Sequence, residues 1–80
     1  MQVSIDISLY PLHEDYRQPI KAFIQRLEQH DNFIIAKNSM STTILGDYQE
    51  IMPILEKEMF TSLQDLPESV FVIKLSGGCQ

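Results

Sequence analysis

The sequence contains a single cysteine and no apolar run that approaches the ~20 residues of a membrane-spanning helix. One cysteine, Cys79, cannot form a disulfide within the chain, and its place near the C-terminus favours an incidental thiol over a catalytic one. The N-terminus has neither the basic start nor the long apolar stretch of a secretion signal. These absences predict a cytoplasmic protein.

Positive charge is scarce, because 6 Lys and Arg residues stand against 11 Asp and Glu residues and leave a formal net charge of −5. Nucleic acid phosphates are bound by basic surfaces, so this balance argues against a nucleic acid partner. An acidic surface would suit a cationic ligand, although modest acidity by itself mainly keeps a protein in solution. The sequence also lacks a glycine-rich loop of the kind that holds phosphate groups.

Sets of residues that could carry out catalysis are missing as well. The two histidines, His13 and His30, fall at opposite ends of a predicted helix, too far apart to cooperate, and the serines have no evident base. His13, Glu14 and Asp15 are adjacent in a loop but lack any recognised spacing of metal ligands. We therefore expect a protein that is not an enzyme and has no metal or cofactor.

What the sequence does contain is a regular alternation of strand and helix patterns. Apolar and polar residues alternate strictly from Val3 to Tyr10, which predicts a strand that Pro11 ends. Helical spacing of apolar residues predicts helices over residues 15–30, which Asp15 could cap, and from Asp47 onward, where Asp47 and Glu50 have capping-box spacing. The runs 32–38, 42–46 and 69–75 are typical of strands, and the first two are joined by a turn at Ser39–Met40.

This order of elements predicts one α+β domain over residues 1–80, a ferredoxin-like βαββαβ sandwich with a four-stranded antiparallel sheet and two helices on one face. Right-handed crossovers place the first and third strands in the middle. The bare face would carry Ser4, Asp6, Ser8 and Tyr10, together with either Val70 and Val72 or Phe71, Ile73 and Leu75. A domain this short buries only ~60% of its unfolded surface. We therefore expect a homo-oligomer that forms through this face.

The run NSMSTT, residues 38–43, crowds an amide and four hydroxyls into six residues. It is typical of a turn leading into an exposed strand, and equally of a ligand cradle, because short polar side chains lose little entropy when they bind. A regular two-residue turn would point Ser41 and Thr42 to opposite faces, so a shared site predicts a bulge or a longer loop here. Asp6, in mid-strand, must be either solvated or paired with a donor or cation.

The segments ISLYPL, MSTTILGDY and SVFVIK together resemble the YkoF-type thiamine-binding family, over a region from about Val3 to Lys74. The resemblance implies non-catalytic binding of thiamine or its hydroxymethylpyrimidine moiety, and sheets packed across a dimer or a dimer of dimers. It implies ligand contacts at Ser8 and Tyr10 of the first segment. In the second segment it implies contacts at Met40, Ser41, Thr42 and Asp47.

The residues and the resemblance together predict a ligand site made of short polar side chains, carboxylates and one aromatic ring. Its members are Asp6, Ser8, Tyr10, Asn38, Ser41, Thr42 and Asp47. Two of the assignments have simpler alternatives, since Asp47 could serve only as a helix cap, and we expect Met40 to pack in the core. The alternative function is that of an oligomeric regulatory or structural domain that senses another small metabolite, such as an amino acid.

Overall fold

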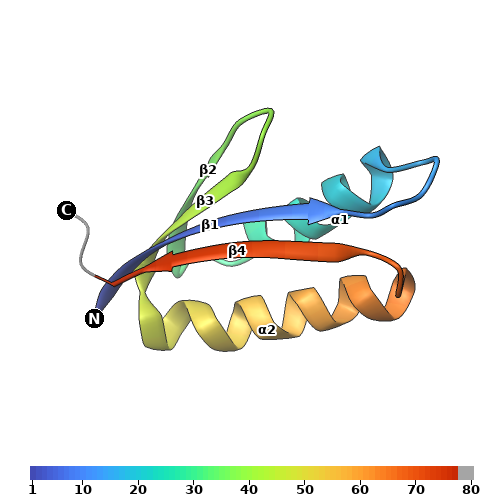
Figure 1. Ribbon diagram of the computed structural model, residues 1–80. Coiled ribbons are helices and arrows are strands. Elements are labelled where there is room, and N and C mark those ends of the chain that lie inside the picture. Colours follow the sequence, from blue (N-terminus) through green and yellow to red (C-terminus); the bar gives the residue numbers. More distant parts are fainter. Residues whose placement is uncertain (78–80) are drawn as a thin grey trace.

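The structure, a computed structural model, describes residues 1–77 and confirms the predicted architecture. Its elements are β1 (Gln2–Tyr10), α1 (Arg17–Glu28), β2 (Phe33–Lys37), β3 (Thr42–Asp47), α2 (Tyr48–Asp65) and β4 (Val70–Ser76). The antiparallel sheet has the order β2-β3-β1-β4, so β1 and β3 lie in the middle, and both helices cover one face (Figure 1). Cys79 lies outside the described residues.

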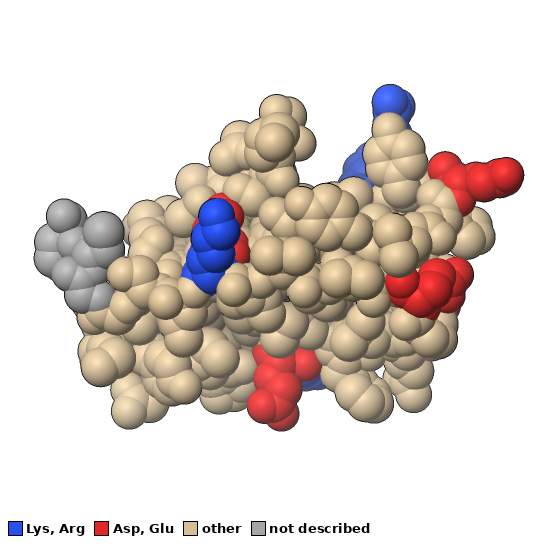
Figure 2. All heavy atoms as spheres, in the orientation of Figure 1, with Lys and Arg blue, Asp and Glu red and all other residues tan. Residues whose placement is uncertain are grey.

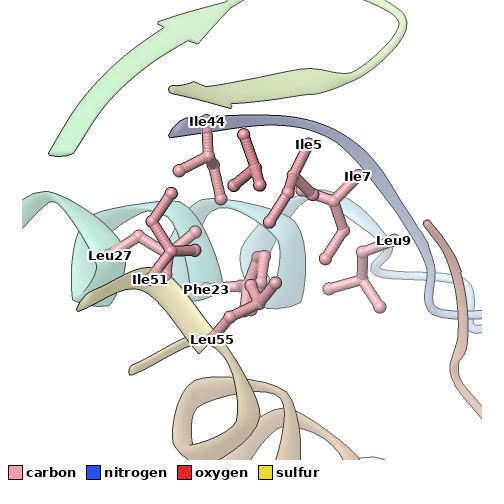
Figure 3. Packing of buried hydrophobic residues seen from close by; sticks show 9 residues of the cluster. Ile5, Ile7, Leu9, Phe23, Leu27, Ile44, Ile51 and Leu55 are labelled. Carbon is pink, nitrogen blue, oxygen red and sulfur yellow. The ribbon is translucent and has the colours of Figure 1, made fainter. Parts of the chain in front are cut away.

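The hydrophobic core lies between the sheet and the helices (Figure 3). The inward residues of β1 are all buried, as their alternation predicts; they are Val3, Ile5, Ile7 and Leu9. The opposing buried residues are Phe23 and Leu27 of α1, Ile44 of β3, and Ile51 and Leu55 of α2. Each such side chain stabilises the fold by ~1.5–3 kcal/mol relative to an exposed position.

The strand register decides which residues lie on the face away from the helices, called the open face below. Asp6 pairs with Thr43 of β3 and with Lys74 of β4, and Ser8 pairs with Val72. Paired residues share a face, so the open face carries Ser4, Asp6, Ser8, Tyr10, Ile34, Ala36, Thr43, Leu45, Val70, Val72 and Lys74. Of the two predicted sets in the last strand, Val70 and Val72 are therefore the ones on the open face.

The first helix does not begin as predicted. Its N-cap is Tyr16, which makes no capping hydrogen bond with its side chain. Asp15, expected to be the cap, instead donates its backbone N–H to Nδ1 of His13 at 3.2 Å. Helix α1 thus starts at Arg17, one residue beyond the position that Asp15 could cap.

The second helix begins at the predicted cap. Asp47 has extended backbone angles, and its Oδ2 accepts a hydrogen bond from the Gln49 backbone N–H at 3.1 Å. In a capping box the Glu50 side chain would accept from the backbone N–H of Asp47. Here Oε1 of Glu50 instead accepts from Nδ2 of Asn32 at 2.9 Å. Asp47 Oδ1 also forms an ion pair with the Met1 ammonium group at 2.9 Å, and this hydrogen bond holds the pKa of Asp47 below its ordinary value.

Replacing Asp47 with alanine should lower the midpoint of thermal unfolding, because the helix loses its cap. Asparagine also caps well, so Asp47→Asn should keep the cap and lose only the charge. A carboxyl whose pKa is lowered by folding stabilises the fold above its unfolded pKa, ~3.9, and this contribution is lost as the pH falls through the folded value. Thermal melts should therefore separate wild type from Asp47→Asn more at pH 7 than at pH 3, where the contribution of the charge is being lost. Equal midpoints for wild type and Asp47→Ala at pH 7 would reject the capping role.

A polar cluster between the helices was not predicted. Glu58 is 6% exposed, and its Oε1 accepts from Nε of Arg26 at 2.8 Å. Nη2 of Arg26 donates to the Glu58 carbonyl at 3.0 Å and to Oγ of Ser62 at 2.6 Å. Nε2 of His30 lies 3.4 Å from Oε2 of Glu58. These four residues, called the interhelical cluster, join α1 to α2.

Neither helix in the described part of the chain is long and apolar enough to cross a membrane.

Candidate functional site

The polar run 38–43 forms a regular hairpin turn. The register between β2 and β3 continues to Lys37↔Thr42, and the Asn38 N–H donates to the Ser41 carbonyl at 3.1 Å. Oδ1 of Asn38 accepts from the backbone N–H groups of Met40 and Ser41 at 2.7 and 2.9 Å, which fixes the turn. The predicted bulge or longer loop is wrong. So is the expectation that Met40 packs in the core, since its side chain is 82% exposed at the tip.

A cavity opens where the hairpin leaves the first strand. The ladder between β1 and β3 ends at Ile7↔Thr42, and beyond that pair the tip of the hairpin bends away from β1 (Figure 1). The resulting cavity of about 90 Å³ is called the hairpin-end cavity. It is lined by apolar residues from beneath and by the polar turn above: Ile7, Leu9, Ile20, Phe23, Ile24, Ser8 and residues 38–42.

The position of the hairpin-end cavity explains how a regular turn can bring both Ser41 and Thr42 to one site. Ser41 and Thr42 do point to opposite faces of the sheet, as a regular turn requires. Both nevertheless line the hairpin-end cavity, because the cavity lies at the end of the sheet and is reached from both faces. Ser8, Asn38, Ser41 and Thr42 are thus four predicted site residues that the structure brings together around one cavity.

The hydrogen bonds around the cavity decide which groups a ligand could use. Ser41 Oγ donates to Oδ1 of Asp6 at 2.5 Å, so Asp6 is paired, and Ser8 Oγ donates to the Met40 carbonyl at 3.3 Å. Both serine oxygens therefore remain free to accept. Thr42 is only 5% exposed and no described residue bonds its hydroxyl. Because every fully buried side-chain oxygen or nitrogen in the described chain has a partner, that hydroxyl is not fully buried, and Thr42 lines the cavity.

Three predicted site residues do not line the cavity, and one of them, Asp6, is bonded to Ser41, which does. Tyr10 lies further along β1, paired with Val70 on the open face and half exposed. Asp47 lies at the opposite end of β3 from Thr42, where it caps α2, so its carboxylate is not part of the hairpin-end cavity.

One charged neighbour of the site was missed by sequence reasoning. Lys74 of β4 pairs with Asp6 on the open face, so a cation stands beside the carboxylate to which Ser41 is bonded. Lys74 lies two residues after Val72 and four after Val70, so it shares their face of β4. The sequence could have placed Lys74 on the open face only if the face of Val70 and Val72 had been known. The rest of the surface over β1 and β4 is largely uncharged (Figure 2).

Residues 2–80 match the family model described as the YKOF-related family. The chain belongs to this family. The resemblance stated from the ISLYPL, MSTTILGDY and SVFVIK segments is thereby confirmed. No curated protein matches the chain.

Solved structures with the same fold come from several organisms. Protein SP2199 of Streptococcus pneumoniae superposes with a TM-score of 0.89 at 21% identity, covering 98% of this chain and 88% of that one. TM0486 of Thermotoga maritima, described as a proposed thiamine biosynthesis/salvage protein, has a TM-score of 0.86 at 19% identity, covering 98% and 85%. The hypothetical protein MJ1052 of Methanocaldococcus jannascii has a TM-score of 0.82 at 24% identity, covering 98% and 81%. At these identities the likeness shows the fold alone.

Among residues 1–77, no three His, Cys, Asp or Glu side chains gather closely enough to hold a metal ion. His13 and Asp15 are joined by a backbone hydrogen bond in the loop before α1.

Proposed function

We propose that this domain is a non-catalytic binding protein for thiamine or a related pyrimidine, and that it holds the pyrimidine ring at the hairpin-end cavity. The observation that carries the proposal is the cavity itself, with an apolar floor and a polar rim that contains four of the residues named from the sequence. Membership of the YkoF-related family and the described role of the Thermotoga neighbour support the same ligand class.

The chemistry of the rim suits an aminopyrimidine. Such a ring presents an exocyclic amine as a donor and ring nitrogens as acceptors. The oxygens of Ser8 and Ser41 can accept from the amine, because both hydroxyl protons are already donated within the protein. The Thr42 hydroxyl can donate to a ring nitrogen. Phe23, Ile7 and Leu9 offer the ring an apolar surface.

The volume of the cavity limits how the ligand can sit. About 90 Å³ is less than the ~150 Å³ cavity that accommodates benzene in a protein core. A pyrimidine ring would therefore enter by one edge, with its substituent outside. Asp6 lies on the open face beside Ser41, where its carboxylate can attract the positive charge of a thiazolium. The neighbouring Lys74 weakens that attraction, so a neutral pyrimidine and thiamine should bind with similar affinity.

The proposed assembly is a homodimer, or a dimer of dimers, that forms through the open face. Large apolar side chains on this face remain substantially exposed; they are Tyr10, Ile34, Leu45, Val70 and Val72. Several large apolar side chains exposed on one face of a sheet are typical of an interaction site. Burying it between two copies would add to the core of a small domain.

The binding site is tested by removing its hydroxyls one at a time. Ser8→Ala, Ser41→Ala and Thr42→Val should each weaken binding of thiamine and hydroxymethylpyrimidine by ~0.5–1.5 kcal/mol, or up to about tenfold. Isothermal titration calorimetry measures the affinities. Thr43→Val is the matched control, because Thr43 neighbours Thr42 but lies on the open face and does not line the cavity.

The result that would end the proposal is equally specific. If the three variants fold normally and none weakens binding by twofold, the polar run serves only as a turn. Absence of binding by either compound, with a saturable response to an amino acid instead, would favour the regulatory domain.

A further inference from the structure

A second cavity lies between the two helices, on the side of the sheet opposite the open face. It has a volume of about 330 Å³, within the ~300–1,000 Å³ typical of small-molecule sites. Its apolar surface is formed by Leu9, Pro19, Ala22 and Leu66. This interhelical cavity is larger than the hairpin-end cavity, and its polar residues are different ones.

A serine without a side-chain hydrogen bond lines this cavity. Ser69, just before β4, is 8% exposed as a residue, and no described residue hydrogen-bonds its side chain. Its Oγ is not fully buried, since no fully buried side-chain oxygen or nitrogen in the described chain lacks a partner. A hydroxyl of this kind beside the cavity is available to bond a ligand atom or water. Ser62 is different, because its Oγ already accepts from Arg26 at 2.6 Å.

The charges around the cavity favour a cation. Asp15 and Asp65 both line it and are exposed at its rim. The lining cation, Arg26, is already neutralised by Glu58, 2.8 Å away. Nδ1 of His13 accepts the Asp15 backbone N–H, so that nitrogen is already occupied within the protein. The two carboxylates therefore determine the net charge of the lining.

We propose that the interhelical cavity binds a small organic cation, a primary amine carried on a compact apolar body. The apolar body would lie against Leu9, Ala22 and Leu66. The ammonium group would lie at the rim with Asp15 and Asp65, and the Ser69 hydroxyl would bond a polar atom of the ligand. This site shares Leu9 with the pyrimidine site but none of its polar residues, and the proposal does not depend on pyrimidine binding.

The test uses benzylamine as the probe and benzyl alcohol, its neutral counterpart of similar shape, as the control. Titration of ¹⁵N-labelled protein with benzylamine should shift the amide signals of Ala22, Leu66 and Ser69 and leave those of Ser41 and Thr42 unchanged. Benzyl alcohol should bind at least about threefold more weakly, because it lacks the charge that the carboxylates attract. Shifts centred on Ser41 and Thr42, or equal binding of the two probes, would overturn the proposal.

Two variants make the assignment specific. Ala22→Leu should fill the cavity and weaken benzylamine binding at least tenfold, whereas the matched Ala36→Leu, on the open face, should leave it unchanged. Asp65→Asn should weaken it about two- to fivefold with little change in size. Amide spectra of the free variants report whether each is folded. Unchanged affinity in a folded Ala22→Leu and in Asp65→Asn would show that the cavity is not a site for organic cations.

Discussion

Glu58→Ala should destabilise the protein by about 2–3 kcal/mol, a large loss for a single charged residue. Glu58 is buried, and its carboxylate bonds the Arg26 guanidinium. Breaking a fully buried ion pair costs ~3–5 kcal/mol, because the remaining charge has lost its partner. Arg26 has 27% of its side chain exposed and can turn partly to water, which places the expected loss below that range. Chemical denaturation measures the change.

Glu56 provides the control on the same helix, because it is exposed and absent from the interhelical cluster. Glu56→Ala should change the free energy of unfolding by less than ~0.5 kcal/mol. Replacing both charges, with Arg26→Leu and Glu58→Leu together, should recover much of the loss, since neither charge is then left buried alone. Equal effects of Glu58→Ala and Glu56→Ala would show that the cluster contributes nothing to stability.

Leu45→Glu should convert the proposed dimer into monomers. Leu45 lies near the middle of the open face, opposite Ser4 on one side and Ile34 on the other. In a twofold interface each copy would bring its own new carboxylate into the contact, and burying unpaired charges costs several kcal/mol. The dissociation constant should therefore rise at least about a hundredfold. Analytical ultracentrifugation over a dilution series measures it.

Leu63 of α2 is the matched control, because it is a leucine of similar exposure on the opposite side of the molecule, 38% against 41% for Leu45. Leu63→Glu should leave the dimer intact. A wild-type protein that remains a monomer at micromolar concentration would reject assembly through the open face altogether.

The fold could be predicted from the sequence because its periodicities are local. The strict alternation in β1 and the helical stripes of α1 and α2 each follow from one segment of chain. The face of β4 could not be predicted, since Val72 and Ile73 are both apolar and only the pairing of Val72 with Ser8 decides between them. The buried Glu58 carried a signal that was missed, because Ile51, Leu55, Glu58 and Ser62 share one helical stripe.

The candidate site was predictable in composition but not in shape. The sequence indicated that residues 38–42 and Ser8 could meet, since both fall at the same end of the predicted sheet. It could not show that the hairpin bends away from β1 beyond Thr42, which is a tertiary feature and the origin of the cavity. The resemblance assigned Asp47 to the site. In the structure β3 runs for 6 residues from Thr42 to Asp47, so Asp47 lies at the other end of the sheet from the cavity.

The position of β1 in the middle of the sheet has a consequence for how the chain folds. β1 precedes the other strands of this sheet in the chain, yet it acquires its second neighbour only when β4 follows, as in the pairing of Ser4 with Ser76. Contacts this distant in sequence slow folding, because a long loop must close before they form. Until then β1 is an unprotected edge. Asp6, the charge in the centre of this strand, is the kind of residue that keeps such an edge from pairing with another chain.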